Sequence, residues 1–253
     1  MNTLTTRIKA SLIELGSYIL LMRDAFKKPQ NSYLFRQKTL FEFKALGIDS
    51  IAIVLLISLF IGAAVVMQML YNLENPLYPR WVFGFASRKA IILEFSPTVI
   101  SLILAGKCAS RIASEIGTQR LTEQIDALEV MGVNSASYLI LPKIIACVCF
   151  FPILIIFSIA VALIGGGLGA LMVGSITIFN YIEGLRLEFS SADVVYAIVK
   201  TAINAFLISS IASYRGYNVT GTTVDVGHQS TNAVVQSSIF IIIFNMIITK
   251  LFV

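Results

Sequence analysis

The chain consists of long apolar stretches separated by short polar ones. A helix needs about 20 apolar residues to cross the hydrocarbon core of a bilayer, and several stretches reach that length. We therefore predict an all-α membrane protein with five transmembrane helices, at about residues 48–70, 91–113, 138–174, 194–214 and 232–253. Composition agrees: 57% of the residues are hydrophobic, the mean hydropathy is +0.85, and only 13% are charged. Soluble domains are about 25% charged.

The first 47 residues contain no predicted span. Apolar residues recur there every three or four positions, at Ile8, Leu12, Leu15, Ile19, Met22 and Phe26. This spacing, with charged residues between, predicts an amphipathic helix in the membrane interface. A signal peptide fits less well, because Glu14 and Asp24 interrupt the apolar region. Residues 29–32 are typical of a turn. We therefore divide the chain into an amphipathic helix and linker at 1–47 and a five-helix domain at 48–253.

Basic residues predict the orientation in the membrane. The first 47 residues hold eight Lys or Arg, which the positive-inside rule places in the cytoplasm. Five spans then put the loops at 114–137 and 215–231 in the cytoplasm, and the acidic loop at 175–193 and the C-terminus outside. Arg80, Arg88 and Lys89 fall on the outer side, against the rule. They either serve anionic headgroups or are a minor violation of it.

The second span carries charged residues, which are costly in a membrane. Glu94 lies near one end of the span, and Lys107 and Arg111 lie near the other. Such charges usually face a cavity or a partner, although long basic side chains near a helix end also reach out to water. Pro97 has no N–H and therefore frees the carbonyl of Leu93. Together with Glu94, this carbonyl predicts a polar notch in an apolar wall.

A short amphipathic helix is predicted directly after this span. We expect Gly117 to end the span, Thr122 to cap the new helix and Gly132 to stop it. Its apolar face comprises Leu121, Ile125 and Leu128, and its acidic face comprises Glu123, Asp126 and Glu129. Such a helix is either a simple surface loop or a docking element for a soluble partner.

The motifs of this region resemble those of a known family. Residues 94–133 read EFSPT, AGKCAS, SEIG and TEQIDALEVMGV in order, and further matches are FIG at 60–62 with Gln68, LPKIIA at 141–146, GGGLG at 165–169 and the segment 227–239. This pattern resembles the Mla-type permeases, the membrane subunits of ABC transporters that move phospholipid. The chain departs from the family pattern in four places: Leu93 replaces Arg, Ser96 replaces Gly, Lys107 replaces Arg, and Asn245 replaces Asp.

The resemblance implies a set of partners and a location. It implies a homodimer, a separate cytoplasmic ATPase that holds the ATP, and a periplasmic lipid-binding protein of the MCE type. The location implied is the bacterial inner membrane, with a cytoplasmic N-terminus and a periplasmic C-terminus. We expect a phospholipid cavity lined by Val65, Met69, Asn72, Leu73, Leu93, Glu94 and Phe95. We expect coupling to the ATPase through Glu115, Gly117, Thr122, Glu123, Gln124, Asp126, Glu129 and Gly132.

Missing motifs narrow the choice of function. The chain has no GxxxxGK[ST] phosphate loop, so we expect it to bind neither ATP nor another cofactor itself. A single histidine, His228, makes a metal site or a hydrolase triad improbable, and a net charge of +5 is better explained by topology than by nucleic-acid binding. Two alternatives remain. One is an ion-coupled carrier or small channel using Glu94, Lys107 and Lys200, and the other is a structural membrane anchor.

Overall fold

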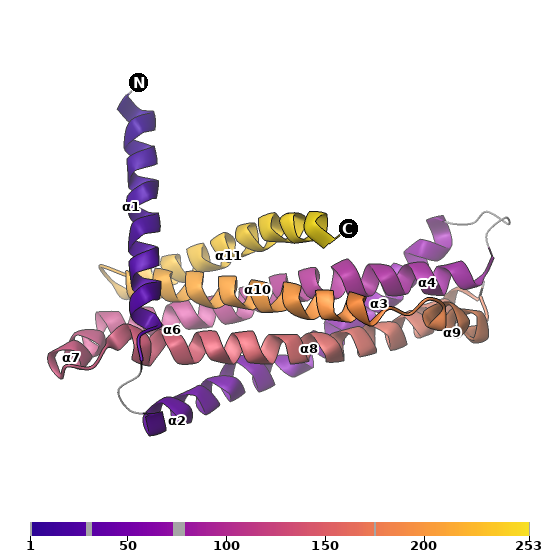
Figure 1. Cartoon of the computed structure of the whole chain (residues 1–253), viewed down its shortest axis with the longest axis horizontal. Coiled ribbons are helices and arrows are strands. Elements are labelled where there is room, and N and C mark those ends of the chain that lie inside the picture. Colours follow the sequence, from indigo (N-terminus) through magenta and orange to yellow (C-terminus); the bar gives the residue numbers. More distant parts are fainter. Residues whose placement is uncertain (1, 29–31, 73–78, 175, 253) are drawn as a thin grey trace.

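The computed structural model describes residues 2–28, 32–72, 79–174 and 176–252, and every regular element in them is a helix. Five of these helical stretches are long and apolar enough to cross a membrane: Ser32–Tyr71, Trp81–Leu121, Ser135–Val173, Ser191–Tyr217 and Thr223–Leu251. They form an elongated bundle (Figure 1). The predicted fold class, all-α with five membrane spans, is confirmed.

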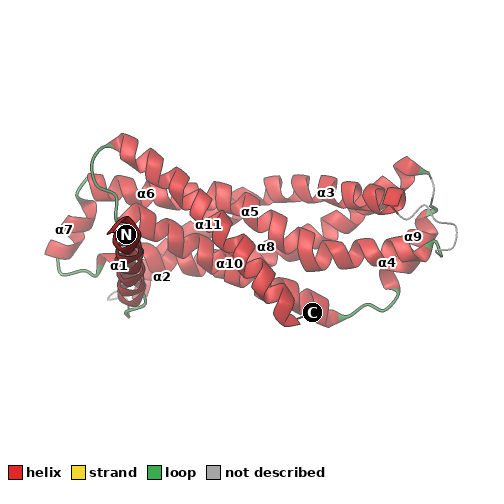
Figure 2. Ribbon diagram, turned by 90° about the horizontal axis from the view of Figure 1, so that it is seen from above, coloured by secondary structure: helices red, strands yellow, loops and turns green. Residues whose placement is uncertain are grey.

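The amphipathic segment forms α1 (Asn2–Ala25), which stands nearly at right angles to the bundle (Figures 1 and 2). Continuous helical structure then follows from α2 (Ser32–Glu42) through the π-helical η1 (Phe43–Gly47) and the short η2 (Ile48–Ser50) into α3 (Ile51–Asn72). The first spanning helix therefore begins at Ser32 and not near residue 48. Of the predicted turn, residues 29–31 lie outside the described residues, and Ser32 already belongs to α2.

The second spanning helix is also longer than predicted. It runs through α4 (Trp81–Ala90), the π-helical η3 (Ile91–Val99), α5 (Ile100–Leu104), the π-helical η4 (Ala105–Ala109) and α6 (Ser110–Leu121). Gly117 lies inside α6, so the prediction that it ends the span is wrong. A Cβ at Gly117 would lie 3.1 Å from Val226 and 3.2 Å from Val219. Gly117 therefore allows Val219 and Val226 to pack closely against α6, and the helix continues through it.

The predicted cytoplasmic helix exists as α7 (Gln124–Val130), but Thr122 does not cap its start. Thr122 ends α6 instead, and its hydroxyl donates to the carbonyl of Thr118 at 2.9 Å. Glu123 makes the turn between the helices with a left-handed backbone (φ 58°). The predicted stop at Gly132 is confirmed: Gly132 has φ 77° and donates to the carbonyl of Glu129, while the next residue donates to the carbonyl of Leu128.

Three further long helices complete the bundle, with one short helix between them. Asn134 caps α8 (Ser135–Val173) by accepting from the N–H of Ser137. The predicted loop at 175–193 contains α9 (Ile178–Arg186), and α10 (Ser191–Tyr217) follows it. Much of the predicted loop at 215–231 is also helical, because α11 begins at Thr223 and runs to Phe252. Asp225 stabilises this start by accepting from the N–H of Thr222 at 2.7 Å.

Glycines bring α3 and α8 into very close contact. A Cβ at Gly165 would collide with the backbone carbonyl of Leu59, and a Cβ at Gly169 would lie 2.7 Å from that of Ala63. On α3, a Cβ at Gly62 would collide with the carbonyl of Ala162. The GxxxG spacing at 165–169 therefore serves helix packing, as such spacing commonly does in membranes.

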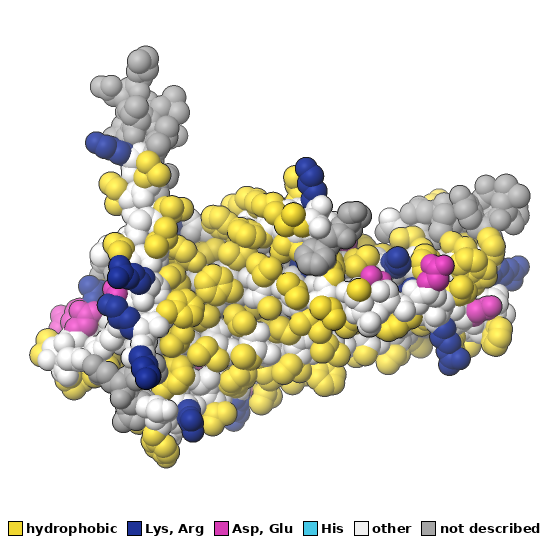
Figure 3. All heavy atoms as spheres, in the orientation of Figure 1, with side chains coloured by type: hydrophobic (Ala, Val, Ile, Leu, Met, Phe, Trp, Pro, Cys, Tyr) yellow, Lys and Arg dark blue, Asp and Glu magenta, His cyan; other side chains and the backbone are white. Residues whose placement is uncertain are grey.

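The two ends of the bundle differ from its middle. Hydrophobic side chains dominate the middle on the face shown in Figure 3, and charged side chains gather towards the ends. α1, α2 and α7 lie at one end, and the start of α4 lies with α9 at the other (Figure 1). Arg88, which strained the predicted orientation, is 1% exposed. Its guanidinium donates to the carbonyls of Leu185 and Leu187 at 2.6 and 2.8 Å and so caps the end of α9.

The α3–α8 contact yields a stability prediction. Gly165→Ala is expected to destabilise the protein by about 1–3 kcal/mol, because the added methyl group meets backbone that cannot move aside. Gly167→Ala is the matched control in the same helix, since its Cβ would meet only Tyr181 at an ordinary 3.6 Å. Thermal unfolding in detergent measures the difference. Equal midpoints for the two variants would contradict the close approach.

Candidate functional site

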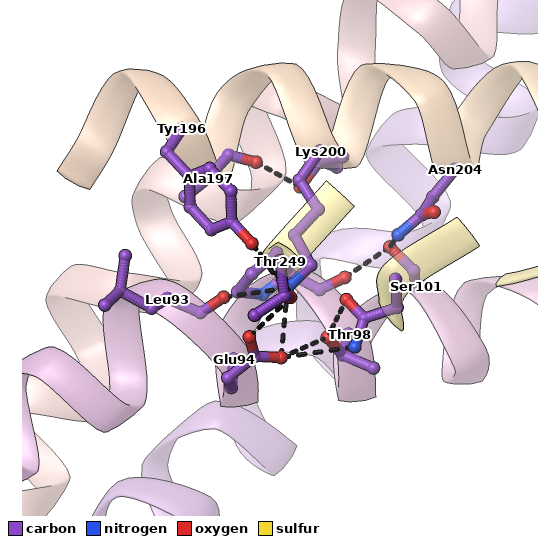
Figure 4. Close-up of polar contacts among 12 residues, drawn as sticks. Leu93, Glu94, Thr98, Ser101, Tyr196, Ala197, Lys200, Asn204 and Thr249 are labelled. Atoms are coloured by element: carbon purple, nitrogen blue, oxygen red, sulfur yellow. Dashed lines mark hydrogen bonds and ion pairs between the residues drawn. The ribbon is translucent and has the colours of Figure 1, made fainter. Parts of the chain in front are cut away.

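The site is built in η3, the π-helical part of the second spanning helix. Pro97 lies inside η3 and supplies no N–H. Lys200, from α10, donates its ammonium group to the carbonyl of Leu93 at 3.0 Å (Figure 4). The carbonyl beside Glu94 is therefore paired with a cation from another helix. This arrangement is the polar notch predicted from Glu94 and Pro97.

Glu94 joins three helices through its carboxylate. Lys200 pairs with its Oε2 at 3.0 Å, and the amide of Asn245 donates to the same oxygen at 3.2 Å. The hydroxyl of Thr249 donates to Oε1 at 2.9 Å. Lys200 comes from α10, and Asn245 and Thr249 come from α11; Figure 4 shows Lys200 and Thr249 beside Glu94. The Glu94 side chain is 41% exposed while that of Lys200 is 0% exposed, so the pair has one open end and one closed end.

Further polar groups extend the site along α10. The ammonium of Lys200 also lies 3.2 Å from the hydroxyl of Tyr196. One turn further on, the amide of Asn204 donates to the hydroxyl of Ser101 at 3.2 Å, and Ser101 donates to the carbonyl of Pro97. The Asn204 Oδ1 atom is buried without a hydrogen-bond partner among the described residues. The site is thus a polar strip between η3, α10 and α11.

Sequence reasoning found part of this set. It identified Glu94 and the Leu93 carbonyl as one feature, and it named Glu94 and Lys200 together only as parts of an ion route with Lys107, not as an ion pair. The available signal was that isolated charges in membrane spans usually pair with one another. It missed the roles of Tyr196, Asn245 and Thr249, because hydroxyls and amides in an apolar helix carry no sequence signal of their partners.

The other residues predicted to line a lipid cavity are placed differently. Val65 is buried and packs in one cluster with Ile91 and Ala162. Met69 and Leu93 are half-buried, and Phe95 is exposed. Leu73 lies outside the described residues, as does the side chain of Asn72. The structure therefore brings Leu93, Glu94 and Phe95 to an accessible position and leaves Val65 in the interior.

Half of the eight residues predicted to couple to an ATPase form side-chain bonds within the chain, including Thr122. Asp126 pairs with Arg120 at 2.6 Å, and Glu129 accepts from the hydroxyl of Ser135 at 2.8 Å. Glu115 pairs with the buried Lys143 at 2.7 Å. Glu123 and Gln124 are exposed. The acidic face of α7 is therefore largely used inside the chain.

An apolar tip stands next to this acidic face. Val130 is 89% exposed and Met131 is 67% exposed, at the far end of α7. The predicted apolar face, in contrast to this tip, points inward: Ile125 is fully buried and Leu128 is half-buried. Sequence reasoning missed the tip because it searched this helix for one apolar face. An exposed pair of large apolar side chains at a helix end favours contact with a partner.

The basic residues at the end of the second span do not reach out to water alone. Arg111 donates to the carbonyl of Ala45 at 3.0 Å, and Lys107 donates to the carbonyl of Asp49. Both carbonyls lie where helical bonding is irregular, in η1 and η2. Within the described ranges, no group of three or more His, Cys, Asp and Glu residues could hold a metal ion.

Comparison with known proteins finds a matching family model and several relatives. The chain matches the family model described as Permease MlaE over residues 39–251. A "Probable ABC transporter permease protein" of Rickettsia bellii is 32% identical over 211 residues, which are 82% of this chain and 80% of the relative. The "Protein TRIGALACTOSYLDIACYLGLYCEROL 1, chloroplastic" of Arabidopsis thaliana is 30% identical, over 85% of this chain and 61% of the relative.

A third relative carries a more specific name. The "Intermembrane phospholipid transport system permease protein MlaE" of Haemophilus influenzae is 28% identical, over 83% of this chain and 80% of the relative. Because the family model covers most of the chain, including both η3 and α7, this chain belongs to the MlaE permease family, whose members are non-catalytic membrane subunits of ABC transporters.

Proposed function

We propose that this chain moves phospholipid, as the permease subunit of an ABC transporter whose ATPase is a separate chain. The observation that carries the proposal is the Glu94–Lys200 pair, which opens on one side from the wall of a membrane-spanning bundle. A phospholipid combines a charged head with apolar tails. An ion pair that is partly exposed in an apolar wall offers the headgroup a polar contact at the depth where the tails are buried.

Anion exchange at Lys200 would explain how a lipid enters this site. Lys200 is fully buried, so leaving it without an anion is unfavourable at every stage. A lipid phosphate can replace the Glu94 carboxylate at the ammonium, while Asn245 and Thr249 continue to hold the displaced carboxylate. In this scheme Glu94 is a gate for the headgroup and takes part in no bond-making step.

The two ends of the bundle suit different partners. We propose that the end formed by α1, α2 and α7 is cytoplasmic, because the eight basic residues lie in the first 47 positions. The ATPase would dock on α7 there. A periplasmic MCE-type protein would receive or deliver lipid at the α4–α9 end. A homodimer in the bacterial inner membrane completes the proposed assembly.

An ion-coupled carrier is less well supported by the geometry. That function would use Glu94, Lys107 and Lys200 as one route. Lys107 is about three and a half helical turns from Glu94 and bonds to the carbonyl of Asp49. Membership of an ABC permease family also supplies an energy source that an ion route would duplicate.

Substitution of Glu94 tests the lipid site. Glu94→Ala is expected to lower lipid transfer by the reconstituted complex about tenfold or more, because the substitution removes a charged hydrogen-bonding group from the gate. The ATPase should still co-purify with the variant. Glu14→Ala, an exposed acid on α1, is the control and should transfer lipid normally. Unchanged transfer by Glu94→Ala would overturn the assignment of the site.

Substitutions on α7 test the docking of the ATPase. Val130→Ser/Met131→Ser is expected to weaken ATPase binding about tenfold or more, because it removes two large apolar contacts. Reversal of Asp126 and Glu129 to Lys is also expected to release the ATPase, since it breaks the bonds to Arg120 and Ser135 that hold α7 in place. Co-purification with titrated ATPase measures both effects. Normal binding by both double variants would show that α7 is not the docking element.

A further inference from the structure

A second group of buried charges lies apart from the proposed lipid site. The ammonium of Lys143 pairs with Glu42 at 2.6 Å and with Glu115 at 2.7 Å. Lys143 is 0% exposed, Glu42 is 1% exposed and Glu115 is 33% exposed. The three residues come from α8, α2 and α6. We call them the Lys143 cluster.

The Lys143 cluster joins α6 and α8, the two helices that flank α7. Glu115 lies on α6, which leads into α7, and Lys143 lies on the first part of α8, which leads out of it. α7 is further fixed to the start of α8 by the bond between Ser135 and Glu129, and to the end of α10 by the bond between Tyr217 and Glu129. A movement of α7 is therefore transmitted to both α6 and α8, and the Glu115–Lys143 pair holds these two helices together.

Glu42 connects α6 and α8 to the first spanning helix. It ends α2, and helical structure continues from it through η1 and η2 into α3. Two more cations of the second spanning helix hold the same region: Arg111 donates to the carbonyl of Ala45, and Lys107 donates to the carbonyl of Asp49. Lys38, one turn before Glu42, lies 4.2 Å from the ring centre of Tyr138 on α8. Polar contacts thus tie α2 to both α6 and α8.

These contacts resist sliding in a way that apolar contacts do not. Apolar side chains exchange one neighbour for another at little cost, whereas separating a buried ion pair leaves an uncompensated charge. The second carboxylate oxygen of Glu42 is buried without a hydrogen-bond partner in the described part of the chain. The hold on the Glu42 carboxylate therefore rests on Lys143, and α2 cannot move away from α8 without breaking that bond.

We propose that the Lys143 cluster is the joint that carries movement of α7 into α3. The inference rests on the proposed function, because it needs an ATPase that moves α7. It assigns Glu42, Glu115 and Lys143 a positioning role: they bind neither lipid nor nucleotide, and they make α2, α6 and α8 move as one body. Through α3, that body reaches η3, the segment that carries Glu94, because α3 packs against η3.

The test compares lipid transfer with ATP hydrolysis in proteoliposomes that contain the chain and its ATPase. Glu115→Gln keeps the shape of the side chain and removes its charge. It is expected to lower the amount of lipid moved per ATP hydrolysed about fivefold or more, with the ATPase still bound and hydrolysing. Glu14→Gln is the matched control and should keep the normal ratio, because Glu14 is an exposed acid on α1 whose ion pair with Arg215, at 2.7 Å, lies outside the cluster. An unchanged ratio in Glu115→Gln would overturn the proposal.

A distance measurement separates this role from a loss of folding. Spin labels at the exposed positions Gln37 on α2 and Thr118 on α6 should give one narrow distance, the same with and without ATP. Glu115→Gln should broaden that distance. A change of the distance with ATP in the unsubstituted chain would contradict movement as one body. Failure of the unsubstituted chain to bind an ATPase or transfer lipid would instead overturn the proposed function.

Discussion

Pairing of buried cations determines how this bundle is assembled. Arg88, Lys143 and Lys200 are among the largest fully buried side chains of the described residues. Each one crosses from its own helix to another: Arg88 to carbonyls at the end of α9, Lys143 to carboxylates on α2 and α6, and Lys200 to η3. A membrane supplies no water to solvate such groups, so each must find its partner within the protein. The cations therefore specify which helices are neighbours more strictly than apolar packing can.

The same requirement explains the irregular helical segments. π-helical turns occur at 43–47, 91–99 and 105–109, and there the backbone bonds from residue i to residue i+5 and departs from the regular α-helix. Two of these segments receive cations from other helices, at Ala45 and at Leu93. The irregular backbone and the buried charge therefore satisfy each other. The Glu94–Lys200 ion pair is exposed on one side, and we proposed it as the lipid site. The Glu42–Lys143 ion pair is buried, and we proposed it as part of a structural joint.

The sequence predicted what depends on local pattern. Hydropathy predicted five spans, because about 20 apolar residues are needed wherever a helix crosses a bilayer. Gly132 was predicted as a helix stop, since a left-handed backbone there favours glycine. Gly117 and Thr122 were misassigned, because both look like helix ends locally and only the packing against Val226 and the turn at Glu123 decide otherwise. The pairing of Lys200 with Glu94 is a contact between helices far apart in sequence, and no local pattern encodes it.

The substitution at Leu93 can now be interpreted physically. The resemblance leads us to expect a cation directly before the acid of this site, whereas here that position is a half-buried leucine. Lys200 supplies the positive charge from a neighbouring helix and binds the backbone of Leu93 as well as the Glu94 carboxylate. A cation on η3 itself would move with Glu94. Lys200 is held by α10, so in this chain the strength of the ion pair depends on how α10 and η3 are positioned relative to each other.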